Sequence, residues 1–157
     1  MVPPKTLEIA RGAIIAALYV AVTMLFQPLS YGPMQVRVSE ALTLLPCLWL
    51  EAVPGLFVGC MIANILGGLG PWDVFLGSAA TLIAAILTYF APNRLLAASA
   101  PVLVNAVVVG WYLSFLMNMN ALMSIFYVGC GEAIACFALG LPLVKALGRT
   151  DLIRQKK

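Results

Sequence analysis

The chain contains no histidine and few charged residues of either sign. Of its 157 residues, 10% are charged and 63% are hydrophobic, which is far from the composition of a soluble globular domain. Without histidine, the sequence offers no imidazole for acid–base catalysis and lacks the commonest metal ligand. This composition is typical of an integral membrane protein. We therefore expect no enzyme activity, no metal site and no cofactor.

Motifs for nucleotide binding and for metal or redox chemistry are also missing. No lysine follows a glycine anywhere, which excludes ATP binding through a Gly-x-x-x-x-Gly-Lys-Ser/Thr loop. The four cysteines form no Cys-x-x-Cys pair, and we interpret them as small core residues of apolar runs. They are Cys47, Cys60, Cys130 and Cys136. We predict one transmembrane domain over residues 1–157 that binds no nucleic acid.

The apolar runs predict an all-α bundle of six transmembrane helices. One crossing needs about 20 residues for about 30 Å of hydrocarbon. The difficult stretch is 38–69, because a single helix there would be about 48 Å long. The interruption at Pro54 and Gly55 favours two short helices instead. The expected helices cover residues 7–27, 38–51, 54–68, 73–91, 95–116 and 121–147.

The basic residues predict the orientation of this bundle in a plasma membrane. With six helices and a cytoplasmic N-terminus, eight of the nine lysines and arginines lie inside, as the positive-inside rule requires. These eight are Lys5, Arg11, Arg94, Lys145, Arg149, Arg154, Lys156 and Lys157. A five-helix chain would put Arg94 and the basic C-terminal tail outside. We therefore expect both termini in the cytoplasm and the 28–37 loop outside the cell.

Four charged residues lie in or at the edge of the apolar runs: Arg37, Glu40, Asp73 and Glu132. A charge near the bilayer centre costs roughly 2.5–3.5 kcal/mol on insertion scales, so such residues usually face a cavity or a partner. We predict that these four bind substrate. Two have structural alternatives, since Asp73 could cap the helix that it begins and Glu40 could pair with Arg37 one turn away.

Amides and aromatic residues of the same outer half extend the candidate substrate site. Asn64 and Asn105 offer hydrogen bonds, and Trp111 and Tyr112 offer rings for stacking. Together with carboxylates, such groups suit a planar, hydrogen-bonding ligand, whether neutral or cationic. Alternatively, the two amides join helices to one another, and the two aromatic residues belong to an interfacial belt.

Small residues recur on the first helix at intervals of four. Ala13, Ala17 and Ala21 form one row along a single helix face, and such a row permits close approach by another helix. One interpretation is docking to a separate membrane partner. The other is internal packing against the last helix, at Ala133, Ala135 and Gly140.

Several segments resemble one known family of membrane proteins. Residues 31–46 have the sequence YGPMQVRVSEALTLLP, residues 59–64 GCMIAN, and Gly131-Glu132 precedes LGLP at 139–142. Asp73, Asn105-Ala106 and Gly68-Leu69-Gly70 match as well. These motifs are similar to those of QueT-type proteins, the substrate-binding S components of energy-coupling factor (ECF) transporters for queuosine precursors. The resemblance runs nearly from end to end.

The resemblance implies a six-helix S component whose pocket opens outward beneath the loop between the first two helices. It implies docking of the Ala13, Ala17 and Ala21 face on a transmembrane T component, which two cytoplasmic ATPases drive. The implied ligand is queuine or a 7-substituted 7-deazaguanine, with carboxylates at its guanine-like edge and at an aminomethyl cation. The competing hypothesis is a stand-alone proton- or ion-coupled secondary transporter with Glu132 as the coupling acid.

Overall fold

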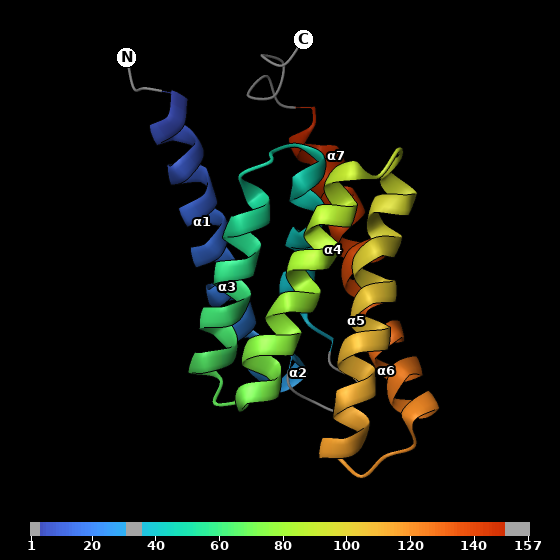
Figure 1. Ribbon diagram of the computed structural model, residues 1–157. Coiled ribbons are helices and arrows are strands. Elements are labelled where there is room, and N and C mark those ends of the chain that lie inside the picture. Colours follow the sequence, from blue (N-terminus) through green and yellow to red (C-terminus); the bar gives the residue numbers. More distant parts are fainter. Residues whose placement is uncertain (1–3, 31–35, 150–157) are drawn as a thin grey trace.

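A computed structural model describes residues 4–30 and 36–149 of the chain (Figure 1). These residues form helices and no strand. Seven α-helices are joined by one 3₁₀ helix and two π-helical segments. In chain order they are α1 (Pro4–Leu25), α2 (Gln27–Ser30), η1 (Val38–Cys47), α3 (Ala52–Leu66), η2 (Asp73–Gly77), α4 (Ser78–Phe90), α5 (Arg94–Leu116), α6 (Ala121–Ala133), η3 (Ile134–Gly140) and α7 (Leu141–Leu147).

Four of the helical stretches are long and apolar enough to cross a membrane. They are Lys5–Leu25, Asp73–Phe90, Arg94–Leu116 and Ala121–Leu147. The third and fourth begin behind the caps Asn93 and Asn120, whose side chains accept from Leu96 N and Leu122 N, both at 2.9 Å. Two shorter apolar helices, η1 and α3, lie between the first and second of these stretches. The fold is therefore an all-helical bundle with the composition of a membrane protein.

The stretch 38–69 contains two short helices, as predicted, but their bounds and type differ from the prediction. The first is a 3₁₀ helix that ends at Cys47 rather than at residue 51, and α3 ends at Leu66. A 3₁₀ helix rises about 2.0 Å per residue, so these ten residues extend as far as about thirteen residues of α-helix. The first helix, α1, ends at Leu25 rather than at residue 27. A separate short helix, α2, follows, and Pro28 lies in its first turn.

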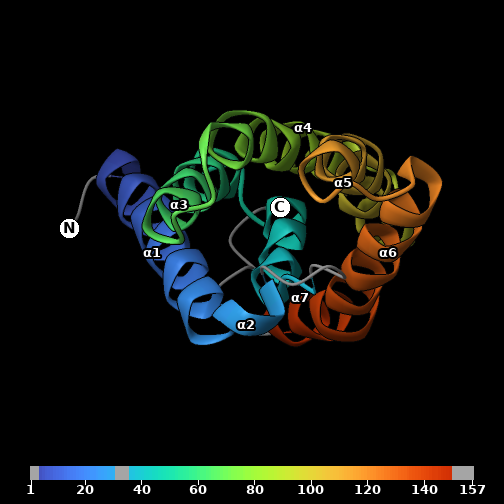
Figure 2. The same ribbon diagram turned by 90° about the horizontal axis from the view of Figure 1, so that it is seen from below.

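The helices surround η1, which lies inside the ring that they form (Figure 2). Seven residues of η1 are buried, and the helix contacts α1, α3, α4, α5, η3 and α7. Two side chains donate to the backbone carbonyl of Glu40: Thr43 Oγ1 of η1 itself at 2.5 Å and Cys136 Sγ of η3 at 3.7 Å. A charged residue on η1 is therefore placed in the interior of the bundle.

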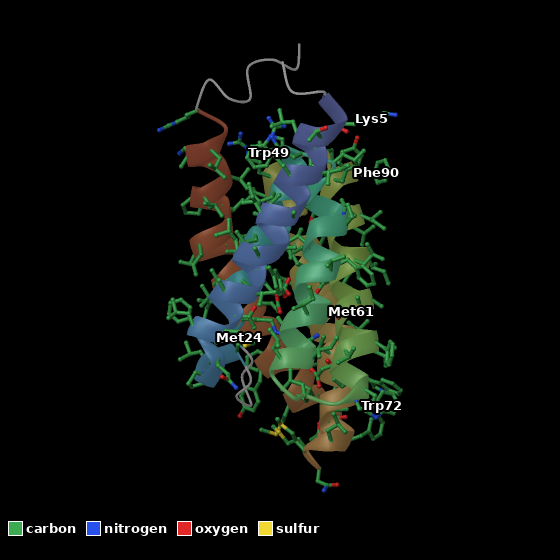
Figure 3. The ribbon with its side chains drawn as sticks, turned by 90° about the vertical axis from the view of Figure 1, so that its left-hand side faces the viewer. Lys5, Met24, Trp49, Met61, Trp72 and Phe90 are labelled. Atoms are coloured by element: carbon green, nitrogen blue, oxygen red, sulfur yellow. The ribbon has the colours of Figure 1, made fainter. Side chains whose placement is uncertain are left out.

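Several basic residues gather at one end of the bundle. The same end of the bundle holds the start of α1, the turn between α4 and α5, and the end of α7 (Figure 1). Figure 3 shows Lys5 and Trp49 at this end and Trp72 at the opposite one. Arg94 and Lys145 lie on the helices that reach the same end as Lys5. Arg154, Lys156, Lys157 and residues 31–35 of the 28–37 loop fall outside the described residues.

Small residues let α1 and α3 pack at very short range. A Cβ atom added to Gly55 would lie 2.5 Å from the Gly12 carbonyl oxygen, and one added to Gly59 would lie 2.9 Å from the Ala16 carbonyl oxygen. The side of α1 with Gly12 and Ala16 thus faces its own bundle. Ala13, Ala17 and Ala21 are exposed instead, so their packing against the last helix, one of the two interpretations above, is wrong.

Candidate functional site

A cluster of buried polar side chains surrounds Glu40 at the centre of the bundle. The Glu40 side chain is fully buried. Tyr19 of α1 donates its hydroxyl hydrogen to Glu40 Oε1, and Thr81 of α4 donates to the same oxygen at 3.3 Å. Three separate helical elements therefore meet at one carboxylate. Its second oxygen, Oε2, has no hydrogen-bond partner in the part of the chain that the structure describes.

A second buried carboxylate, Glu132 of α6, lies near Glu40. Its side chain is 4% exposed, and it interacts electrostatically with Glu40. The Asn105 amide, on α5, lies beside both carboxyl groups. Two carboxylates from distant parts of the sequence thus share one polar interior, which costs free energy unless protons or a cation balance their charge.

Arg37 and Asp73 form the third part of the cluster. Arg37 Nη2 lies 3.9 Å from Asp73 Oδ1, and both residues are 3% exposed. Tyr112 donates its hydroxyl hydrogen to the same Asp73 oxygen at 2.9 Å. The capping alternative for Asp73 is therefore wrong, because Asp73 lies inside η2 behind the N-cap residue Trp72. Arg37 lies within ion-pair distance of Asp73 and also interacts electrostatically with Glu40, as the pairing alternative for Glu40 predicts.

Asn64 ties α3 to the start of the next helix, as the interhelical interpretation predicts. Its Nδ2 donates to the Asp73 carbonyl oxygen at 2.7 Å and to Ser78 Oγ at 3.4 Å. Its Oδ1 atom is buried and has no hydrogen-bond partner within residues 4–30 and 36–149. The amide nitrogen of Asn64 therefore links α3 to η2 and α4, while its amide oxygen remains available as an acceptor.

Four acceptor atoms of this cluster are buried and have no hydrogen-bond partner among the described residues. They are Glu40 Oε2, Asn64 Oδ1, Asn105 Oδ1 and Glu132 Oε2. Leaving a buried acceptor unsatisfied costs about 1–3 kcal/mol, and more for a charged group. Such groups in a native structure call for a functional explanation. A ligand with several N–H donors would satisfy them.

Trp111 lies apart from this cluster, on the outer face of α5. Its side chain is 50% exposed and packs edge to face on Phe115, with 5.0 Å between the ring centroids. With Trp72 and Phe115 it lines a surface groove, an arrangement typical of an interfacial aromatic belt. Its sequence neighbour Tyr112 points inward instead, because adjacent residues on a helix lie about 100° apart.

Three residues of the cluster were not singled out by the sequence analysis as candidate site residues. Tyr19 and Thr81 hold Glu40, and Cys60 lies among polar groups rather than in a purely apolar core. Its sulfur accepts from Thr81 Oγ1 at 3.4 Å and from Asn64 Nδ2 at 3.5 Å. The sequence signal for Tyr19 was weak, since a single hydroxyl group in an alanine-rich membrane helix does not by itself mark a site.

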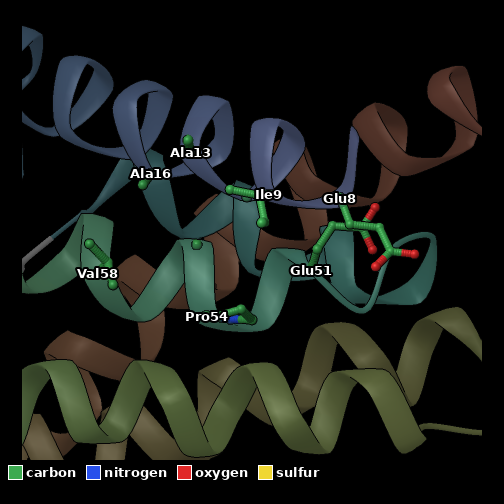
Figure 4. A pocket seen from close by; sticks show the side chains of 9 residues that line it. Glu8, Ile9, Ala13, Ala16, Glu51, Pro54 and Val58 are labelled. Carbon is green, nitrogen blue, oxygen red and sulfur yellow. The ribbon is translucent and has the colours of Figure 1, made fainter. Parts of the chain in front are cut away.

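A groove runs along the outside of the bundle between α1 and α3. It has a volume of about 450 Å³, and its lining includes Gly12, Ala13 and Gly55 (Figure 4). Glu8 and Glu51 lie at one end of the groove, where Arg11 Nη1 approaches Glu51 Oε1 at 3.2 Å. Ala13 belongs both to this groove and to the exposed alanine row, so this side of α1 presents small side chains outward.

Comparisons with known proteins give one family and one relative. The model of a family described as QueT transporter matches residues 9–149. A protein of Lactococcus lactis subsp. cremoris, called Queuosine precursor transporter QueT, is 42% identical over 82 residues. The match covers 50% of this chain and 47% of that protein, so it extends over about half of each. No solved structure matches the chain.

Proposed function

Because the chain belongs to the QueT transporter family, we propose that it binds a queuosine precursor from outside the cell as the S component of an ECF importer. The ligand is queuine or a related 7-deazaguanine. A transmembrane T component and two cytoplasmic ATPases supply the transport step. The chain crosses the plasma membrane six times and keeps both termini in the cytoplasm. The basic residues at the end where α1 begins and α7 ends support this orientation.

The buried polar cluster is the observation that carries this proposal. A guanine-like base presents N–H donors along one edge, and the unpartnered acceptors of Glu40, Glu132, Asn64 and Asn105 match that pattern. Glu40, Glu132, Asn105, Asp73, Arg37, Asn64 and Tyr112 are the proposed substrate-binding residues within the cluster. Trp111, on the outer face, would contribute through the aromatic groove that it shares with Tyr112.

Isothermal titration calorimetry of the purified chain tests ligand binding. We expect saturable binding of queuine and of 7-aminomethyl-7-deazaguanine. Adenine, which has a different order of donors and acceptors, should give no saturable heat. The proposal is contradicted if neither deazaguanine binds, or if adenine binds as well as they do.

The exposed row of Ala13, Ala17 and Ala21 is the proposed docking face for the T component. Close approach of two membrane helices depends on small side chains, since lipid-facing apolar groups gain little from burial against one another. We expect Ala17→Trp to abolish co-purification of the T component and the two ATPases while leaving ligand binding intact. The measurement is affinity capture of the tagged chain after co-expression of all four proteins.

The matched control is Val107→Trp on α5, which lies on the other side of the bundle from α1 (Figure 2). Val107 is 58% exposed, so a tryptophan there meets no packed neighbour and the complex should remain. Undiminished capture of the complex by the Ala17→Trp variant would refute the docking face. Accumulation of ligand by proteoliposomes that contain this chain alone, driven by a proton gradient, would instead favour the stand-alone carrier.

A further inference from the structure

The charges of the buried cluster do not balance. Three carboxyl groups, those of Glu40, Asp73 and Glu132, face one guanidinium group, that of Arg37, and all four side chains are nearly or fully buried. An unpaired carboxylate in such surroundings is unfavourable, and an added positive charge relieves the cost. The imbalance therefore favours a ligand that brings a cation.

The three carboxylates differ in how well the chain itself satisfies them. Asp73 has the ion pair with Arg37 and a hydrogen bond from Tyr112. Glu40 accepts from two hydroxyl groups, those of Tyr19 and Thr81. Glu132 has neither an ion pair nor a hydroxyl donor within the described residues, and its polar neighbour is the amide of Asn105. Glu132 is thus the carboxylate that most lacks a positive partner.

We propose that this site selects a cationic 7-deazaguanine, with Glu132 as the counter-ion of an ammonium group on the 7-substituent of the ligand and Glu40 as an acceptor for the N–H edge of the ring. This inference rests on the proposed function and assigns separate roles to the two carboxylates. A secondary or primary ammonium group supplies a positive charge and two or three N–H donors, which suit Glu132 Oε2 and the neighbouring Asn105 Oδ1. A nitrile at the same ring position supplies only an acceptor, its nitrogen atom, which would face the acceptor oxygens of Glu132 and Asn105.

A matched pair of ligands tests the selectivity. 7-Aminomethyl-7-deazaguanine and 7-cyano-7-deazaguanine share one ring and differ in the charge and donor count of the substituent. By calorimetry on the intact chain, we expect the aminomethyl base to bind at least about tenfold more tightly, the size of one charge-assisted hydrogen bond. Equal or tighter binding of the cyano base would overturn the inference and leave the proposed function standing. Binding of neither base contradicts the proposed function itself.

Variants of the two carboxylates test the assignment. Glu132→Gln should lower affinity for the aminomethyl base about tenfold or more, with little change for the cyano base, so that the preference is lost. Glu40→Gln should weaken both ligands by a similar factor and keep the preference. Glu132→Asp retains the negative charge and should also keep the preference for the aminomethyl base. This variant replaces Glu132→Gln as the test if Glu132→Gln does not fold. A Glu132→Gln protein with the full parental preference would show that another group meets the ammonium.

Discussion

Replacing Glu40 with glutamine is expected to weaken the binding of queuine and of 7-aminomethyl-7-deazaguanine about tenfold to hundredfold. A charge-assisted hydrogen bond contributes roughly 1.5–3 kcal/mol, and about 1.4 kcal/mol corresponds to a factor of ten. In the variant, an amide oxygen can still accept from Tyr19 and Thr81 at the position of Oε1. The amide nitrogen then replaces Oε2 and opposes a donor of the ligand. Calorimetry with both bases measures the loss.

The control for this substitution is Glu51→Gln. Glu51 pairs with Arg11 at one end of the surface groove between α1 and α3, away from the buried cluster. Removing the Glu51 charge should therefore leave ligand affinity unchanged. The thermal unfolding midpoint of Glu40→Gln should stay near that of the parent, since the hydroxyl bonds persist. Parental affinity in a folded Glu40→Gln protein would mean that this carboxylate has a structural role alone.

Replacing Gly55 with leucine is expected to destabilise the whole bundle. Already a Cβ atom at this position would lie 2.5 Å from the backbone oxygen of Gly12, so α1 would have to move away from α3. Overpacking of this kind typically costs about 1–3 kcal/mol, whereas leucine gains at most about 1 kcal/mol over glycine in helix propensity. The clash therefore outweighs the gain in propensity, and the unfolding midpoint in detergent should fall.

Ala17→Leu provides the comparison on the exposed face of α1. Ala17 is exposed and is not part of the lining of the groove between α1 and α3, so the added side chain points away from α3 and the unfolding midpoint should change little. Gly55→Ala should fall between the parent and Gly55→Leu. A Gly55→Leu protein as stable as the parent would contradict the close packing of α1 on α3.

Hydropathy located the helices well, because lipid-compatible runs and proline or glycine breaks are local properties of the sequence. The predicted stretches 73–91, 95–116 and 121–147 agree closely with the observed Asp73–Phe90, Arg94–Leu116 and Ala121–Leu147. Hydropathy could not predict that η1 is a 3₁₀ helix or that two long helices contain π segments. Those geometries depend on how η1 is enclosed by the surrounding helices, which a local pattern does not contain.

The sequence predicted the charged residues of the candidate site better than its uncharged ones. Arg37, Glu40, Asp73 and Glu132 stand out because burying a charge in a membrane is costly, and the structure brings all four together. Tyr19 and Thr81 escaped notice because a hydroxyl group is common in membrane helices. Likewise, the sequence has small residues on two sides of α1, Gly12 with Ala16 and the row of Ala13, Ala17 and Ala21. It does not indicate which of the two sides meets α3. That choice depends on the phase of one helix against another.

The π segment η3 makes the number of residues between α6 and α7 as consequential as their identity. A π turn holds one residue more than an α turn. Deleting one residue from Ile134–Gly140 would let this segment form a regular α turn and would leave α7 at nearly its present rotation relative to α6, because the π turn already absorbs the extra residue. Straightening η3 into an α-helix without a deletion would instead rotate α7 by about 100°. Val144, now buried beside Leu44, Ala98 and Cys136, would then turn away from that core. The extra residue held in η3 thus decides which face of α7 is turned inward.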